Sequence, residues 1–210
     1  MPKQPDIAGN LDPIVYVIDD DPEIRDALLD LLAASNKRAA AFASGKEFLE
    51  RAHIDAAGCV LVDFRMPGLN GLDLQDQLAT MGSNLPVIFL TAFADIPTSV
   101  RAMKAGAADF ITKPFDSSVL LDAIENAIEL NREQRKHSAE KDHIDELMGS
   151  LTPRENEVMQ AVVRGLMNKQ IAFELGISEM TVKLHRMSLM RKMQVRSLAE
   201  LVRTVEHARR

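Results

Sequence analysis

The sequence predicts two domains: an α/β domain built on a parallel five-stranded sheet, and a small all-α domain. Strand-like apolar segments alternate with helix-like segments up to residue 130, whereas residues 151–210 show helical periodicity throughout. Residues 1–130 carry 10 Lys/Arg and 20 Asp/Glu, but residues 151–210 carry 11 Lys/Arg and 6 Glu. An acidic front and a basic back are typical of domains with different partners, and the basic half indicates nucleic acid.

The strands of the first domain are predicted from five short apolar segments, at residues 13–20, 38–44, 59–63, 85–92 and 108–114. Each is followed by apolar residues at helical spacing, at residues 21–35, 45–52, 71–81, 95–107 and 116–130. Strands that alternate with helices form a parallel sheet that is covered on both faces. A length of about 120 residues fits a flavodoxin-like sheet of order 2-1-3-4-5.

Polar side chains stand at the carboxyl ends of these strands. Asp19 and Asp20 follow the first strand, Asp63 ends the third, Thr91 ends the fourth, and Lys113 follows the fifth. Because the carboxyl ends of parallel strands meet at one edge, we expect these five side chains to converge. Three carboxylates close together repel one another, so the sequence predicts a divalent cation among them. An all-oxygen site of this kind suits Mg²⁺.

The same side chains suit phosphoryl chemistry. Asp63 can act as a nucleophile, because carboxylates form aspartyl-phosphate intermediates. Lys113 offers a positive charge and Thr91 a hydroxyl to the phosphoryl oxygens. Asp21 fits the N-cap of the following helix better than a metal site.

Four stretches of the first half resemble the receiver domain of two-component response regulators over residues 13–130: "VIDDDPEIR", "LVDFRMPGLNG", "FLTA" and "AADFITKPF". The resemblance implies that Asp63 accepts a phosphoryl group from a sensor histidine kinase. It also implies that Asp20 binds Mg²⁺ directly, that Asp19 acts partly through water, and that the backbone carbonyl of Arg65 is a further ligand.

The resemblance extends to a switch made of Thr91 and Phe110. Many relatives have Tyr at the position of Phe110, so here any movement of this ring must be a change of packing. The switch is expected to create a dimer contact on the helix at 95–107 and the strand that follows. The step from Lys113 to Pro114 resembles the cis lysine-proline bond of the family, since cis bonds are essentially confined to X-Pro.

The connection between the domains, residues 131–148, is polar and highly charged. It could be a disordered linker or a continuation of the preceding helix, and its helix-forming residues favour a helical linker. Residues 1–12 are expected to form a flexible N-terminus.

The second domain contains four helical segments, at residues 151–165, 167–176, 177–193 and 196–210. Thr152 and Pro153 mark the start of the first, and Ser178 caps the third. A short helix that stops at Gly176 and is followed by a helix rich in cations indicates a helix-turn-helix.

The third of these helices is expected to bury Val182, Leu189 and Met193 and to present another face to DNA. The residues expected on that face are Lys183, Leu184, Met187 and Arg191. A lysine can bond to guanine, and an apolar side chain can contact a thymine methyl group. Leu184 and Met187 could instead be core or dimer residues. Phosphate contacts are expected from Asn168, Lys169, Thr181, Arg186 and Lys192.

Residues 149–210 resemble the LuxR/FixJ-type DNA-binding domain, and the whole chain resembles a FixJ-type response regulator. The resemblance implies a transcriptional regulator rather than an enzyme, which forms a homodimer when phosphorylated and binds promoter DNA and RNA polymerase. Some relatives carry a cation at the position of Met187.

The sequence disfavours two other functions. A phosphatase that uses Asp63 as nucleophile would need a carboxylate two residues later, where this chain has Arg65, which cannot donate a proton usefully. A degenerate receiver that serves only as an interaction protein is disfavoured, because all five strand-end residues are present. We also expect a cytoplasmic protein without a membrane partner, because no apolar run approaches the roughly 20 residues of a membrane span and the N-terminus lacks a signal-peptide pattern.

Overall fold

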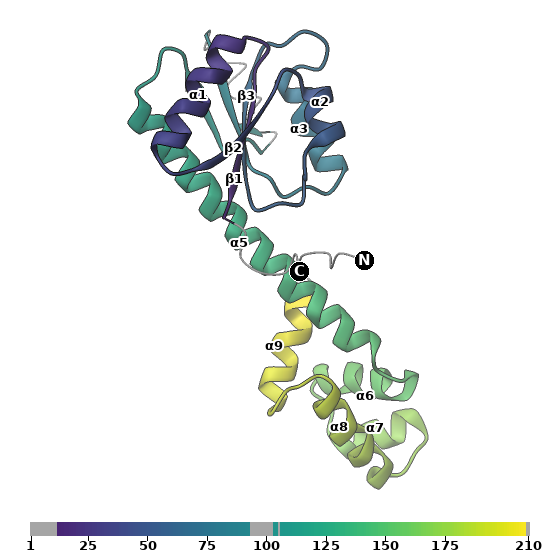
Figure 1. Cartoon of the computed structure of the whole chain (residues 1–210). Coiled ribbons are helices and arrows are strands. Elements are labelled where there is room, and N and C mark those ends of the chain that lie inside the picture. The colour runs from purple at the N-terminus through teal and green to yellow at the C-terminus, as the bar shows by residue number, and fades with distance from the viewer. Residues whose placement is uncertain (1–11, 93–102, 105, 209–210) are drawn as a thin grey trace, which may run out of the picture. The chain divides into compact units, whose positions relative to one another are not determined.

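The structure is a computed structural model that describes residues 12–92, 103–104 and 106–208 (Figure 1). The chain divides into two compact units, Met1–Arg135 and Lys136–Arg210. The expected flexible N-terminus lies outside the described residues except for its last position, and the expected helix at 95–107 lies largely outside them.

The first unit is built on a five-stranded parallel sheet of order β2-β1-β3-β4-β5, which confirms the predicted fold class. Its strands are β1 (Ile14–Ile18), β2 (Arg38–Phe42), β3 (Gly58–Asp63), β4 (Val87–Thr91) and β5 (Asp109–Thr112). The helices described around it are α1 (Pro22–Ala34), α2 (Gly45–Arg51), α3 (Gly71–Thr80) and α5 (Ser117–Gly149).

Both faces of this sheet are covered (Figure 1). Val15 and Val17 of β1 pack with α1 and α5 on one face, whereas Tyr16 and Ile18 pack with α2 and α3 on the other. Alternate residues of a strand point to opposite faces, so an apolar run without alternation fits a strand buried on both sides.

Helix α5 is longer than the fifth helix predicted from the sequence, and it includes all of residues 131–148. Asn131 on this helix is only 1% exposed. Its side chain accepts a hydrogen bond from the Gly58 backbone N at 3.1 Å and donates one to the Asn84 carbonyl at 2.5 Å. Arg135 donates to the carbonyl of Asp55. The first unit therefore extends past residue 130.

The second unit contains α6 (Pro153–Val163), α7 (Asn168–Leu175), α8 (Glu179–Lys192) and α9 (Leu198–Ala208). Gly176 ends α7 with a φ of 65°, a left-handed conformation that glycine adopts without strain. Ser178 caps α8, and its hydroxyl accepts from the Thr181 backbone N. Thr152 and Glu155 form a capping box at the start of α6. The four helices share one apolar core.

Within the described part of the chain, no helix has the length and apolarity that crossing a membrane requires.

Candidate functional site

An ion-paired cluster lies at the carboxyl edge of the sheet. The Lys113 ammonium donates to Asp19 Oδ2 and to Asp63 Oδ1, each at 2.7 Å. Asp19 directly follows β1 and Asp63 ends β3, and these two strands pair in parallel with Ile18 opposite Val62. The topology thus brings together residues 94 and 50 positions apart in the sequence.

Backbone groups orient both carboxylates of this cluster. Asp63 Oδ2 accepts from the Arg65 backbone N at 2.7 Å, and Asp19 Oδ1 accepts from the Asp21 backbone N at 3.0 Å. The side chain of Asp21 in turn accepts from the Glu23 backbone N at 2.9 Å, so Asp21 is the N-cap of α1, as expected. Both carboxylates are therefore held in place before any ligand arrives.

The charge of Lys113 partly offsets the negative charge of this acidic edge. Burial lowers the pKa of Lys113, but the hydrogen bonds and charges of Asp19 and Asp63 together outweigh burial, so the pKa lies above its ordinary value. Lys113 consequently stays protonated at neutral pH. Asp19 is 2% exposed, and a carboxylate so deeply buried requires a partner of this kind.

The other expected members of the site lie at neighbouring strand ends. Thr91 is buried at the end of β4, and its carbonyl accepts from the Lys113 backbone N at 2.6 Å. Asp20 is exposed, and it lines an open hollow together with Arg65 and Asn70. The peptide bond between Lys113 and Pro114 is cis, as predicted.

Phe110 belongs to an aromatic cluster beside the site. Its ring lies 5.8 Å from that of Phe64 and 6.2 Å from that of Phe89, measured between centroids. The sequence reasoning missed Phe64 and Gly71. A Cβ added at Gly71 would lie 2.8 Å from Phe89 Cε1 and 3.1 Å from the Asp63 carbonyl, so glycine is needed where α3 begins against this cluster. The sequence signal that could have identified Gly71 is its position at the start of a predicted helix shortly after Asp63.

Helix α8 of the second unit has the buried face and the exposed face that the sequence predicts. Val182, Leu189 and Met193 are buried, and the four residues expected to face DNA are all exposed: Lys183, Leu184, Met187 and Arg191. Leu184 is 56% and Met187 is 67% exposed, so neither belongs to the core of this unit.

The residues expected to contact phosphate differ in their surroundings. Lys169 is exposed, and the Thr181 hydroxyl lies 2.8 Å from that of Ser178. Arg186 donates to the Asn168 side chain at 2.8 Å, which joins α8 to α7.

Lys192 forms hydrogen bonds within the second unit. Its ammonium donates to Glu155 Oε2 at 2.6 Å and to the Ser150 carbonyl at 3.0 Å. Glu155 Oε1 accepts from the Ser188 hydroxyl at 2.6 Å. The hydrogen bonds from Lys192, Ser188 and the Thr152 backbone lower the pKa of Glu155 to about 2. From these internal partners we infer a structural role for Lys192, and its expected phosphate contact stays a prediction. The sequence reasoning did not predict the contact of Glu155 with α8.

Comparisons with known proteins match both units. Residues 15–125 match the family described as the response regulator receiver domain, and residues 149–205 match the bacterial regulatory proteins of the luxR family.

Relatives match nearly the whole chain. Nodulation protein W of Bradyrhizobium diazoefficiens is 45% identical over 92% of this chain and 85% of its own length. The transcriptional regulatory protein FixJ of the same organism is 40% identical over 92% of this chain and 95% of its own. Among solved structures, the response regulator StyR shares 48% identity with a TM-score of 0.83, and 93% of this chain and 99% of that one are covered. These matches, on a chain whose first unit has the parallel sheet order 2-1-3-4-5, show that the protein belongs to the FixJ-like response regulators, the phosphorylation-dependent transcriptional regulators of two-component systems.

Proposed function

We propose that Asp63 accepts a phosphoryl group from a sensor histidine kinase, and that the phosphorylated chain forms a homodimer that binds promoter DNA through α8. The observation that carries the proposal is the position of the Lys113 ammonium, 2.7 Å from one oxygen of Asp63 and 2.7 Å from Asp19. An ammonium this close to the Asp63 carboxylate can donate to the oxygens of a phosphoryl group carried on it.

Each residue around Asp63 has a different role in the proposed phosphoryl transfer. A carboxylate oxygen of Asp63 forms the new bond to phosphorus as the bond from phosphorus to the kinase histidine breaks. The Lys113 ammonium and the Thr91 hydroxyl then donate to the transferred oxygens. The Arg65 backbone N keeps the carboxylate oriented through its hydrogen bond to Oδ2.

The donor set also fits Mg²⁺. Asp19, Asp20 and Asp63 supply carboxylate oxygens, and the Arg65 carbonyl supplies a neutral one, which are the ligands that a hard divalent cation prefers. When bound, the ion supplies positive charge to neutralise the phosphoryl oxygens.

The switch that follows phosphorylation involves Thr91 and Phe110. Movement of Thr91 toward the phosphoryl group changes the space beside Phe110, whose ring already contacts Phe64 and Phe89. Packed aromatic clusters adopt discrete arrangements, so a local change of charge can become a new surface for a second receiver.

The direct test measures oligomeric state and DNA binding in the full chain, with and without a small acyl phosphate and Mg²⁺. We expect light scattering to report a shift from monomer to dimer, and mass spectrometry to find the phosphoryl adduct on Asp63. Binding to an inverted repeat with half-sites about 10 base pairs apart should strengthen in parallel. An adduct without any change in mass or DNA affinity would contradict the proposed coupling.

In each half-site we propose that Lys183 contacts a base edge, with Leu184, Met187 and Arg191 beside it. The residues proposed to contact phosphate are Lys169, Thr181 and Arg186. We also propose that the dimer bound to promoter DNA contacts RNA polymerase.

Two lysine variants separate base reading from phosphate binding. Lys183→Ala is expected to cost about 1 to 3 kcal/mol on the specific site and to relax the preference at one base pair. Lys169→Ala should weaken specific and random DNA alike and reduce the salt dependence by about one contact. Binding titrations at a series of salt concentrations measure both effects. An equal loss on all sequences for Lys183→Ala would show that α8 docks differently.

A further inference from the structure

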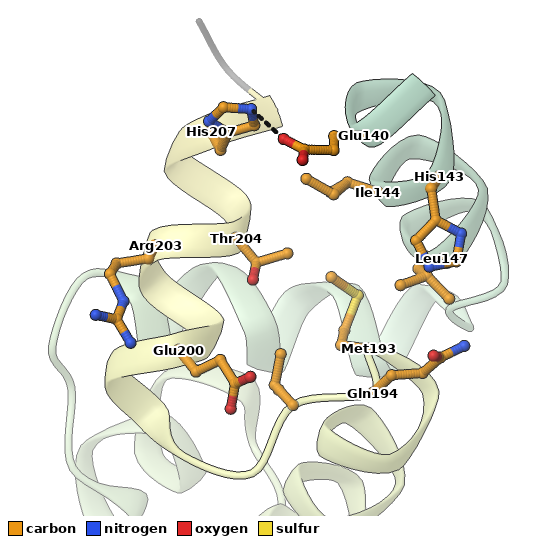
Figure 2. Close-up of a pocket in the computed structure, with 11 residues that line it drawn as sticks. Glu140, His143, Ile144, Leu147, Met193, Gln194, Glu200, Arg203, Thr204 and His207 are labelled. Atoms are coloured by element: carbon orange, nitrogen blue, oxygen red, sulfur yellow. Dashed lines mark ion pairs between the residues drawn. The ribbon is translucent and has the colours of Figure 1, made fainter. Parts of the chain in front are cut away.

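Three side chains with metal-binding atoms come together on the second unit. His137 and Glu140 lie three positions apart on α5, and His207 lies in the last turn of α9. Their ligand atoms all lie within 4.8 Å of one another. His207 Nε2 is 3.9 Å from Glu140 Oε2 (Figure 2), and the two imidazole rings have centroids 6.0 Å apart.

Packing joins the end of α5 to α9. Leu147 and Met148, near the end of α5, pack against a core that includes Leu201 and Val205 of α9. The two helices also line a common groove, in which Figure 2 shows Ile144 and Leu147 of α5 facing Thr204 of α9. Glu140 and His207 line this groove, and His137 lies one helical turn before Glu140 on α5.

We propose that His137, Glu140 and His207 bind a borderline divalent transition metal, with Zn²⁺ as the representative ion, and that the bound metal fastens α9 to the C-terminal half of α5. Two imidazole nitrogens and one carboxylate oxygen form a frequent zinc ligand set. Residues three apart on a helix lie on one face, so His137 and Glu140 can bind the same ion. Mg²⁺ prefers oxygen ligands throughout, so this site differs in chemistry from the edge of the receiver sheet.

The distances are compatible with coordination. Zinc binds nitrogen and oxygen at about 2.0–2.2 Å, which sets tetrahedral donors roughly 3.4 Å apart. All three side chains are exposed, so rotations about their own bonds can adjust separations that already lie within 4.8 Å without a change of backbone. Three protein ligands leave a fourth position for water.

Titration of the untagged full-length chain with Zn²⁺, in the presence of excess Mg²⁺, tests the site. We expect one tightly bound Zn²⁺ per chain and a higher unfolding temperature in its presence, because a ligand that binds the native state stabilises it. Co²⁺ in place of Zn²⁺ should give the visible absorption of a tetrahedral ion. His137→Ala and His207→Ala should each weaken Zn²⁺ binding by about tenfold or more, since even changes to the partners of metal ligands cost about 10–100-fold.

His143→Ala is the matched control. His143 lies on the same helix and lines the same groove, but it is not one of the three converging residues. Its variant should bind Zn²⁺ as the parent chain does, and so should Asp63→Asn, which alters only the receiver. The proposal is overturned if the parent chain binds no Zn²⁺ beside Mg²⁺, if His207→Ala binds it unchanged, or if His143→Ala loses binding to the same degree.

Discussion

Asp63→Asn is expected to abolish the phosphoryl adduct while leaving the chain folded. The amide keeps nearly the shape of the carboxylate but cannot act as the nucleophile. Lys113 retains its second partner, because its ammonium also bonds to Asp19 at 2.7 Å. Phosphorylation-dependent dimerisation and the gain in DNA affinity should disappear with the adduct. Mass spectrometry after treatment with an acyl phosphate and Mg²⁺ measures the first loss, and light scattering the second.

The control for this variant is Asp76→Asn, which removes an exposed carboxylate from α3 of the same unit. It should accept the phosphoryl group and dimerise as the parent chain does. Circular dichroism should show that both variants have the helical content of the parent. Undiminished labelling of Asp63→Asn would show that the phosphoryl group is carried by another residue.

Glu155→Ala is expected to destabilise the DNA-binding unit by about 2 to 4 kcal/mol. The change removes hydrogen bonds from Ser188 and Lys192 to a charged group, worth about 1.5–3 kcal/mol each. The net loss is smaller than their sum, because such contributions are not additive and water can hydrate the freed Lys192 ammonium. Glu155 is 5% exposed, and its carboxylate holds Lys192 and Ser188 of α8 against the start of α6. Hydrogen exchange of the α6 and α8 amides measures the loss in the full chain.

The same carboxylate predicts a dependence on pH. The pKa of Glu155 in the folded chain is about 2, below its ordinary value of 4.5. Its contribution to stability is therefore complete above pH 4.5 and is lost as the pH falls from 4.5 toward 2. Glu155→Gln keeps a side chain that can cap α6, so we expect it to be less destabilised than Glu155→Ala and to lack this component of the acid sensitivity.

Variants of Glu157 and Lys192 serve as controls for Glu155→Ala. Glu157 lies two residues further along α6, where it pairs with Arg154 in an exposed salt bridge, so Glu157→Ala should cost less than about 1 kcal/mol. Lys192→Ala should lower the stability of the unit and leave the salt dependence of DNA binding nearly unchanged. Equal stability of Glu155→Ala and Glu157→Ala would contradict the role assigned to Glu155.

The parallel sheet and the place of its acidic edge could be predicted because both follow from local patterns, and the length of the domain then indicated the strand order. Apolar runs that alternate with helical segments indicate a parallel sheet, and Asp19, Asp63, Thr91 and Lys113 each stand where such a run ends. The rule that strand ends meet at one edge then brings them together without knowledge of any contact. The exposed and buried faces of α8 could also be predicted from a local pattern, because an α-helix repeats every 3.6 residues.

The partners of individual side chains were decided by the tertiary structure alone. Lys192 looked like a free cation on a basic helix, yet it binds Glu155, which is 37 positions away. Nothing in the sequence pairs Glu155 with α8. His137, Glu140 and His207 had no pattern that joins them, because two lie on α5 and one on α9. Periodicity shows which face of a helix is buried. It does not show which neighbour that face meets, because the rotation and spacing of packed helices are set by the side chains of the whole core.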